Sequence, residues 1–457
     1  MKADRLFHLK ENHTDVKTEV IAGITTFMTM AYILAVNPTI LGATGMDSGA
    51  IFTATALAAC VGTLCMALFA NYPFALAPGM GLNAYFAYTV VGGMGYSWKM
   101  ALAAVFVEGI IFILLSLTKV REAVFNAIPM TLKHGVAVGI GLFITFIGLQ
   151  NAHIVVDSST LVTVFSFKNS REAGTFNTEG ITVLLALIGI LITAVLVIKK
   201  VKGNILWGIL ITWVLGMICQ ATHLYKPDAA AGYYSLFPDF SNGLRIPSIA
   251  PTFGKMDFSE LFTGKFLIVV FAFLFVDMFD TLGTLIGVSS KAGMLDEKGK
   301  LKHIKGALLA DAVATSAGAV LGTSTTTTYV ESASGVSEGG RTGLTGITTA
   351  LLFLISLFLS PIFLAIPSFA TAPALVLVGF FMLCSVVHID FNDYSEAIPA
   401  FVTILAMAFM YSISEGIAMG VISYVVINLV TGKAKQKKIS ILMYILALLF
   451  ILKYILI

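Results

Sequence analysis

The chain has 457 residues, of which 58% are hydrophobic and only 12% are charged, and its mean hydropathy is +0.93. This composition excludes an ordinary soluble globular protein and predicts an all-α membrane protein that crosses the bilayer many times. The net charge of +3 is small and its basic residues are spread over short connecting segments, which argues against nucleic acid as a partner.

The N-terminal twenty residues are charged and lack the short apolar core and small-residue cleavage site of a secretory signal. The first apolar segment is therefore expected to direct membrane insertion. The four cysteines lie in apolar segments without disulfide or metal-ligand spacing, and no phosphate loop or nucleophile motif appears. We predict no enzyme activity, no cofactor and no metal site.

Apolar windows predict about fourteen membrane-spanning segments, separated by short polar connections. The expected segments cover residues 19–41, 50–70, 74–91, 99–118, 134–152, 180–198, 203–222, 265–288, 306–323, 329–343, 346–365, 372–388, 397–412 and 415–431.

Lysine and arginine gather in every second connection if the N-terminus is cytoplasmic, as the positive-inside rule requires. These residues are Lys119, Arg121, Lys133, Lys199, Lys200, Lys202, Lys291, Lys298, Lys300, Lys302, Lys305 and Lys433 to Lys438. We therefore expect a multi-pass protein of the cytoplasmic membrane, in contact with the lipid bilayer. The last apolar run, Ile439 to Ile457, is either a fifteenth crossing or a helix at the inner surface anchored by Lys453 and Tyr454, and we favour the surface helix.

Two carboxylates lie in the middle of the apolar stretch Phe271 to Leu285, which reads FAFLFVDMFDTLGTL. At helical spacing Asp277, Asp280, Thr281 and Thr284 share one face, and the other face is apolar. An ionisable side chain near the bilayer centre costs a few kcal/mol or more, so it usually faces a cavity or a partner. The face is predicted to line a substrate or ion site. The alternative is a pair of buried aspartates that bond to a neighbouring helix for packing alone.

Two other segments are poor candidates for lipid-spanning helices. Residues 73–91 read PFALAPGMGLNAYFAYTVV and residues 323–343 read TSTTTTYVESASGVSEGGRTG, which are rich in Pro, Gly, Ser and Thr. Interrupted segments in matching halves point to a transporter's binding site. We expect Pro73 to Ala77 and Thr325 to Tyr329 to be extended, each followed by a half-helix whose amides point at the site.

The two halves share a faint internal repeat of small residues. Ala58, Gly62, Ala77 and Gly79 recur 256 residues later as Ala314, Gly318, Ala333 and Gly335, and Ile128, Pro129 and Gly141 recur 238 residues later as Ile366, Pro367 and Gly379. With seven segments in each half, the second half enters the membrane from the opposite side. The repeat is therefore an inverted one, as in alternating-access carriers.

Glu331 begins the second half-helix, directly after Tyr329 and Val330. A carboxylate there can accept hydrogen bonds from the N–H groups of a planar heterocycle, while Tyr329 or Phe74 offers a ring or backbone contact. Asn83 could bond a carbonyl or ring nitrogen of the same ligand. These residues suit a purine or pyrimidine. Alternatively, Glu331 is hydrated near a membrane surface and Asn83 satisfies loose backbone.

Acidic groups that converge from separate helices also suit proton coupling, and sodium is a weaker alternative for the same oxygens. The remaining intramembrane polar residues are interpreted as solvated or structural. They are Glu108, Glu415, His134, His153 and His388.

Three motifs, APGMGLNAYF, FVDMFDTLGTL and TTTTYVESASGVSEGGRTGLT, resemble those of the AzgA-like purine permeases in the nucleobase and ascorbate transporter superfamily. The likeness covers essentially the whole chain. It implies fourteen helices in two inverted sevens, with a core domain (helices 1–4 and 8–11) that moves against a gate domain (helices 5–7 and 12–14). It also implies a nucleobase site between short strands of helices 3 and 10.

Carried over by residue, the resemblance makes Asp277 and Glu331 the substrate-binding acids, with Tyr329 beside the ligand and Asn83 supporting it. Thr281 stands where uracil-permease relatives have histidine, so the proton-coupling candidates are Asp280, Thr281 and Glu331. The implied function is import of guanine, hypoxanthine and, as a further candidate, adenine, by proton symport with an elevator-like mechanism.

We expect a homodimer through the gate domain. The resemblance also implies a division of the chain into domains. It consists of a core domain at 17–130 and 264–365, a gate domain at 131–225 and 366–432, an extracellular loop at 226–263, and a cytoplasmic-side tail with an apolar helix at 433–457. The rival functions are transport of xanthine or uracil, and an anion carrier or a channel of the same fold. Two acids in the site argue against an anion carrier.

Overall fold

The computed structural model describes residues 6–456 except 117, 119–127, 160, 229–231, 242, 292–293, 295–300 and 302–303. Several basic residues used for the orientation argument lie outside this part of the chain, namely Lys119, Arg121, Lys298, Lys300 and Lys302, and so do the side chains of Lys291 and Lys453.

In the part of the chain that the structure describes, the first half folds into seven segments. They are α2 (Val16–Met30) with α3 (Ile33–Gly42); α4 (Ser48–Phe69); β1 (Leu76–Pro78), α5 (Met80–Ala84) and the π-helix η1 (Tyr85–Gly93); α6 (Trp98–Ser116); α8 (Met130–Asn151); η2 (Phe176–Gly180) with α10 (Ile181–Ile198); and α11 (Asn204–Ala221). A hairpin of β2 (Val155–Ser158) and β3 (Leu161–Val164), followed by α9 (Phe167–Glu172), lies between α8 and α10.

The second half repeats this order. Its segments are α12 (Gly264–Lys291); α13 (Ile304–Leu321); β4 (Thr326–Thr328) with α14 (Ser332–Ser337); α15 (Gly343–Ser356) with η4 (Leu357–Leu359) and α16 (Ser360–Phe363); α17 (Ser368–Leu383) with η5 (Cys384–His388); α18 (Tyr394–Phe409); and α19 (Ile413–Val430), followed by α20 (Ile441–Leu456). Within the described residues, nine helices are long and apolar enough to cross a membrane, and α18, α19 and α20 are shorter apolar helices.

The two interrupted segments are confirmed. Strand β1 pairs antiparallel with β4, so that Ala77 lies opposite Thr327. The first extended stretch runs from Leu76 to Pro78, three residues beyond the expected start at Pro73. Proline is tolerated at the end of this strand because the sheet has only two strands, and an edge position needs no N–H donor.

The helix starts follow the predicted repeat. Helices α4 and α13 begin 256 residues apart and α8 and α17 begin 238 residues apart, the last two directly after Pro129 and Pro367. The strands do not follow it, since Leu76 and Thr326 are 250 residues apart. The matches of Ala77 with Ala333 and of Gly79 with Gly335 therefore do not pair equivalent positions. Helix α13 has 18 residues where α4 has 22, and the connection to β4 is two residues shorter than the connection to β1.

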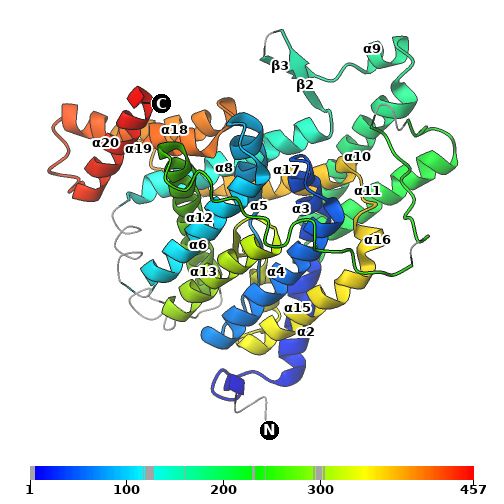
Figure 1. Cartoon of the computed structure of the whole chain (residues 1–457), viewed down its shortest axis with the longest axis horizontal. Coiled ribbons are helices and arrows are strands. Elements are labelled where there is room, and N and C mark those ends of the chain that lie inside the picture. The colour runs from blue at the N-terminus through cyan, green and yellow to red at the C-terminus, as the bar shows by residue number, and fades with distance from the viewer. Residues whose placement is uncertain are drawn as a thin grey trace.

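The helices pack in two groups (Figure 1). The first group contains α2 to α6 and α12 to α15, with β1 and β4 at its centre; the second contains α8, α10, α11 and α17 to α19. In Figure 1 the first group fills most of the lower half of the view and the second most of the upper half. The chain passes between them at three connections, after α6, after α11 and after α15.

Gly141 of α8 and Gly379 of α17 lie against each other at the centre of the second group. A Cβ on Gly141 would lie 2.6 Å from the carbonyl oxygen of Gly379, and a Cβ on Gly379 would lie 2.4 Å from that of Gly141. No Cβ fits at either position without moving one helix. The repeat has thus placed two equivalent small residues where two helix backbones meet.

Gly141→Ala is expected to destabilise the protein by about 1–3 kcal/mol, because overpacking outweighs the better helix propensity of alanine. The thermal unfolding midpoint in detergent should fall by a few degrees. Gly264→Ala is the matched control, since a Cβ there meets no atom within 4 Å. Equal midpoints for both variants would contradict the close contact.

Candidate functional site

The site is built around the β1–β4 pair at the centre of the first helix group. The amide of Tyr329 donates to the carbonyl of Ala75 at 3.0 Å, and the amide of Gly79 donates to that of Thr325 at 3.0 Å. The amide of Ala75 also donates to Oγ of Ser332, at 3.0 Å, in the first turn of α14. Each interrupted segment therefore supplies hydrogen-bond partners for backbone N–H and C=O groups of the other segment, as non-helical backbone at membrane depth requires.

Glu331 lies at the junction of β4 and α14, where its side chain is partly exposed. Tyr32, at the start of α3, donates its hydroxyl to Oε1 of Glu331 at 2.6 Å. The Tyr32 side chain is itself only 1% exposed, so it fixes the carboxylate from the protein side. The prediction that Glu331 starts a half-helix is confirmed. Tyr32 was missed, and the available signal was a tyrosine inside the first apolar segment, where α2 ends and α3 begins.

Asp280 of α12 lies in the same space as Glu331. Its Oδ2 is 3.6 Å from the position that a Cβ on Gly79 would occupy, and its side chain is partly exposed. The charge of Asp280 is close enough to repel that of Asp311 and that of Glu331, and the charges of Asp280 and Glu331 both act on Tyr32 and Tyr329. Two carboxylates of the second half, one on α12 and one at the start of α14, thus lie close together beside the β1–β4 pair.

Asp277 lies in a different environment, with no exposed side-chain surface. The Thr281 hydroxyl oxygen is 3.1 Å from Oδ1 of Asp277, 2.9 Å from each carboxylate oxygen of Asp311, and 2.8 Å from the Thr327 hydroxyl. Asp311 of α13 is also fully buried. Thr281 therefore connects Asp277 to α13 and β4, one layer behind the space shared by Asp280 and Glu331.

Asp311 is a residue that sequence reasoning missed. Its signal was visible, because it is an acidic residue within the apolar segment expected at residues 306–323.

The other predicted ligand contacts are turned toward the protein. The Tyr329 hydroxyl donates to the carbonyl of Pro78 at 2.5 Å, and the Phe74 side chain is fully buried against Tyr72. Asn83 is also fully buried; its amide nitrogen is 3.4 Å from the carbonyl oxygen of Pro78, and its side-chain oxygen accepts from the Ser324 hydroxyl. In this arrangement Tyr329 and Asn83 hold the strand ends in place.

Glu108 and Glu19 are further fully buried acids. Oε2 of Glu108 accepts from the Thr325 hydroxyl at 2.7 Å, so this side chain supports β4 and is not solvated. Glu19 accepts from the Thr345 hydroxyl at 2.6 Å and from the amide of Arg341 at 2.9 Å, which stabilises the start of α15.

Tyr32→Phe is expected to weaken substrate binding about tenfold, because it removes a hydrogen bond to a charged group and frees the Glu331 carboxylate to rotate. The apparent KM of uptake should rise while the amount of protein in the membrane stays constant. Tyr444→Phe, in the C-terminal helix, is the matched control. An unchanged KM in Tyr32→Phe would show that the tyrosine does not position Glu331.

An inverted repeat with paired interrupted segments at its centre defines a membrane carrier. Two solved structures share the fold: the transmembrane domain of a cyanobacterium bicarbonate transporter, BicA (TM-score 0.63, 17% identity, 88% of this chain and 97% of that one), and SLC26A9 (TM-score 0.62, 11% identity, 91% and 66%). The predicted fold class, an all-α protein with about fourteen segments in two inverted repeats, is confirmed.

A model described as a permease family matches residues 17–449, and the chain belongs to this family. It is 50% identical to a putative permease of Methanocaldococcus jannaschii, over 99% of this chain and 98% of the relative. It is 45% identical to the guanine/hypoxanthine permease PbuO of Bacillus subtilis (98% and 99%) and 42% identical to the adenine permease AdeP of Escherichia coli (98% and 95%). The resemblance to purine permeases is confirmed, and the protein is a multi-pass membrane permease, not an enzyme.

Proposed function

We propose that this permease imports purine nucleobases, with guanine and hypoxanthine as first candidates and adenine as a further one, by proton symport across the cytoplasmic membrane. The observation that carries the proposal is the Glu331 carboxylate, which is oriented by Tyr32 and partly exposed beside the β1–β4 crossing. A carboxylate fixed in this way suits the paired N–H donors on the edge of a purine. The names of the permeases PbuO and AdeP support the same substrate class.

Asp280 supplies the proposed link to the proton. It lies within electrostatic range of Glu331, so protonation of one acid removes the repulsion between the two carboxylates. The other acid can then stay ionised and bind the purine base. Asp277 and Thr281 act from the layer behind, through Asp311. Sodium is the weaker alternative as coupling ion.

The first helix group is proposed to be the core domain and the second the gate domain of an elevator, with the N-terminus in the cytoplasm. Polar contacts join the two groups at separate places. Lys202, between α10 and α11, pairs with Glu338 at the end of α14 at 2.6 Å, and the Thr89 hydroxyl of η1 donates to the carbonyl of Tyr411 at 3.4 Å. Contacts of this kind must break when the groups move past each other. A homodimer through the gate domain remains part of the proposal.

Transport should be measured as uptake of radiolabelled hypoxanthine into cells that lack their own purine carriers, competed by each other base, with and without an uncoupler. We expect saturable uptake that guanine competes for and that the uncoupler abolishes. Uptake that depends on sodium would show that sodium is the coupling ion. Preferential competition by xanthine or uracil would show that one of these bases is the substrate. Conduction without saturation would show that the protein is a channel and not a carrier.

A further inference from the structure

Helix α20 is apolar on both of its faces. Met443, Leu446, Ala447 and Phe450 are buried and repeat at helical spacing, so they form the face that contacts the protein. On the other side Ile441, Ile445, Leu448 and Leu449 are between 48% and 78% exposed. A helix that lies on a membrane surface needs a polar face toward water, and most of this exposed face is aliphatic. Acyl chains are the environment that suits it.

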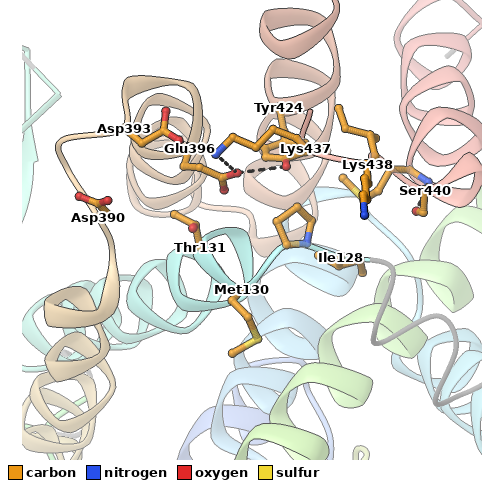
Figure 2. Close-up of a pocket in the computed structure, with 13 residues that line it drawn as sticks. Ile128, Met130, Thr131, Asp390, Asp393, Glu396, Tyr424, Lys437, Lys438 and Ser440 are labelled. Carbon is orange, nitrogen blue, oxygen red and sulfur yellow. Dashed lines mark hydrogen bonds and ion pairs between the residues drawn. The ribbon is translucent and has the colours of Figure 1, made fainter. Parts of the chain in front are cut away.

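The start of α20 is fixed at one end of the second helix group. Ser440 and Met443 line a cavity of about 450 Å³ together with Met130, at the start of α8, and Asp393, at the start of α18. Figure 2 shows this cavity, with Lys437 directed toward Glu396 and with Lys438 and Ser440 further along the same stretch.

Ion pairs hold the connection between α19 and α20 in this place. Lys437 pairs with Asp393 and, at 3.1 Å, with Glu396, while Lys433 lies 3.7 Å from Asp393. The hydrogen bond from Lys437, with a second from Ser395, keeps the pKa of the Asp393 carboxyl well below its usual range. The connection is therefore tied to the first turn of α18, close to where α19 ends.

The far end of α20 lies beside the beginning of α19. The Tyr454 hydroxyl donates to Oε2 of Glu415, in the first turn of α19. Between the two ends, the Phe450 ring meets that of Phe271 on α12, with centroids 5.7 Å apart and planes at 66°. Helix α20 thus runs back along α19 from its end to its start, and its Phe450 contacts α12 on the way.

We propose that α20 crosses the membrane as a fifteenth helix, with lipid acyl chains covering its exposed face. It has 16 residues, the same number as α18, which is one of the fourteen crossings. Ile455, near the end of this helix, then lies on the side of the membrane opposite to Lys433 to Lys438. The inference replaces the surface helix favoured from the sequence and does not depend on which substrate the protein carries.

The sidedness can be measured with single cysteines in a variant whose four native cysteines are replaced by serine. Gln436→Cys and Ile455→Cys are the test positions, and Lys199→Cys and Glu172→Cys, which α10 separates, are the references. A membrane-impermeant maleimide is applied to intact and to permeabilised cells. We expect Ile455→Cys to label like Glu172→Cys and Gln436→Cys to label like Lys199→Cys. The same labelling pattern for Gln436→Cys and Ile455→Cys would overturn the proposal.

A second variant tests the crossing when labelling is weak. Leu448→Arg places a charge in the middle of the exposed face, where a crossing helix meets the centre of the bilayer. The amount of protein in the membrane should fall several-fold, as for Leu191→Arg on the exposed face of α10. If the amount of Leu448→Arg in the membrane equals that of the wild type while the amount of Leu191→Arg is reduced, α20 lies at the membrane surface and the proposal is wrong.

Discussion

Glu331→Gln is expected to abolish purine uptake, lowering its initial rate by roughly a hundredfold or more, because it leaves buried donors of the base without their charged acceptor. Glutamine fills nearly the same space and can still bond to Tyr32, so the fold around α14 should persist. The effect therefore reports on the charge and on the second carboxylate oxygen. The measurement is the initial rate of labelled hypoxanthine uptake, normalised to the amount of protein in the membrane.

The matched control is Glu172→Gln, which removes a carboxylate from the exposed helix α9. Its uptake should equal that of the wild type. Wild-type uptake by Glu331→Gln would show that Glu331 does not bind the base. A low amount of this variant in the membrane would show that Glu331 acts in folding instead.

Asp280→Asn is expected to uncouple transport of the base from the proton gradient. An amide cannot release a proton, so accumulation of hypoxanthine against its gradient should be lost, while exchange of labelled for unlabelled base persists. The structure motivates this choice, because Asp280 is the partly exposed acid of α12 that interacts with Glu331. Counterflow in proteoliposomes, compared with uptake driven by an imposed pH gradient, measures the two activities separately.

Asp277→Asn is the comparison from the same helix. Because the resemblance implies that Asp277 is a substrate-binding acid, and because it is fully buried with Thr281, we expect this variant to lose exchange as well as accumulation. Accumulation by Asp280→Asn at the wild-type level would show that Asp280 is not the proton-coupling group. The coupling group would then lie among the buried residues Asp277, Thr281 and Asp311.

The sequence shows where the membrane chain must be interrupted, because Pro, Gly and Thr inside an apolar segment conflict with a lipid-spanning helix. The two extended stretches and the half-helix that begins at Glu331 were therefore predictable. The acidic face of α12 was predictable for the same reason, since charge inside an apolar helix needs a partner.

Which partner each side chain meets was not predictable. Asp277 and Asp280 share one helix face, yet the first bonds to Thr281, which also bonds to Asp311, and the second lies beside the segment at Gly79. Tyr32 reaches Glu331 across 299 residues of sequence. Such contacts depend on the distance and rotation between helices, which tertiary packing sets and which a single sequence does not encode in its periodicity.

The pairing of β1 with β4 has a mechanical consequence. Because each strand carries its own half-helix and both are joined by backbone hydrogen bonds, the two halves of the binding region must travel together as a single rigid cassette. Relative movement of the two helix groups must then be taken up in the connections between the groups, such as residues 357–367 between α15 and α17. Stiffening one of them, for example with a cross-link, should slow turnover without altering affinity for the cargo.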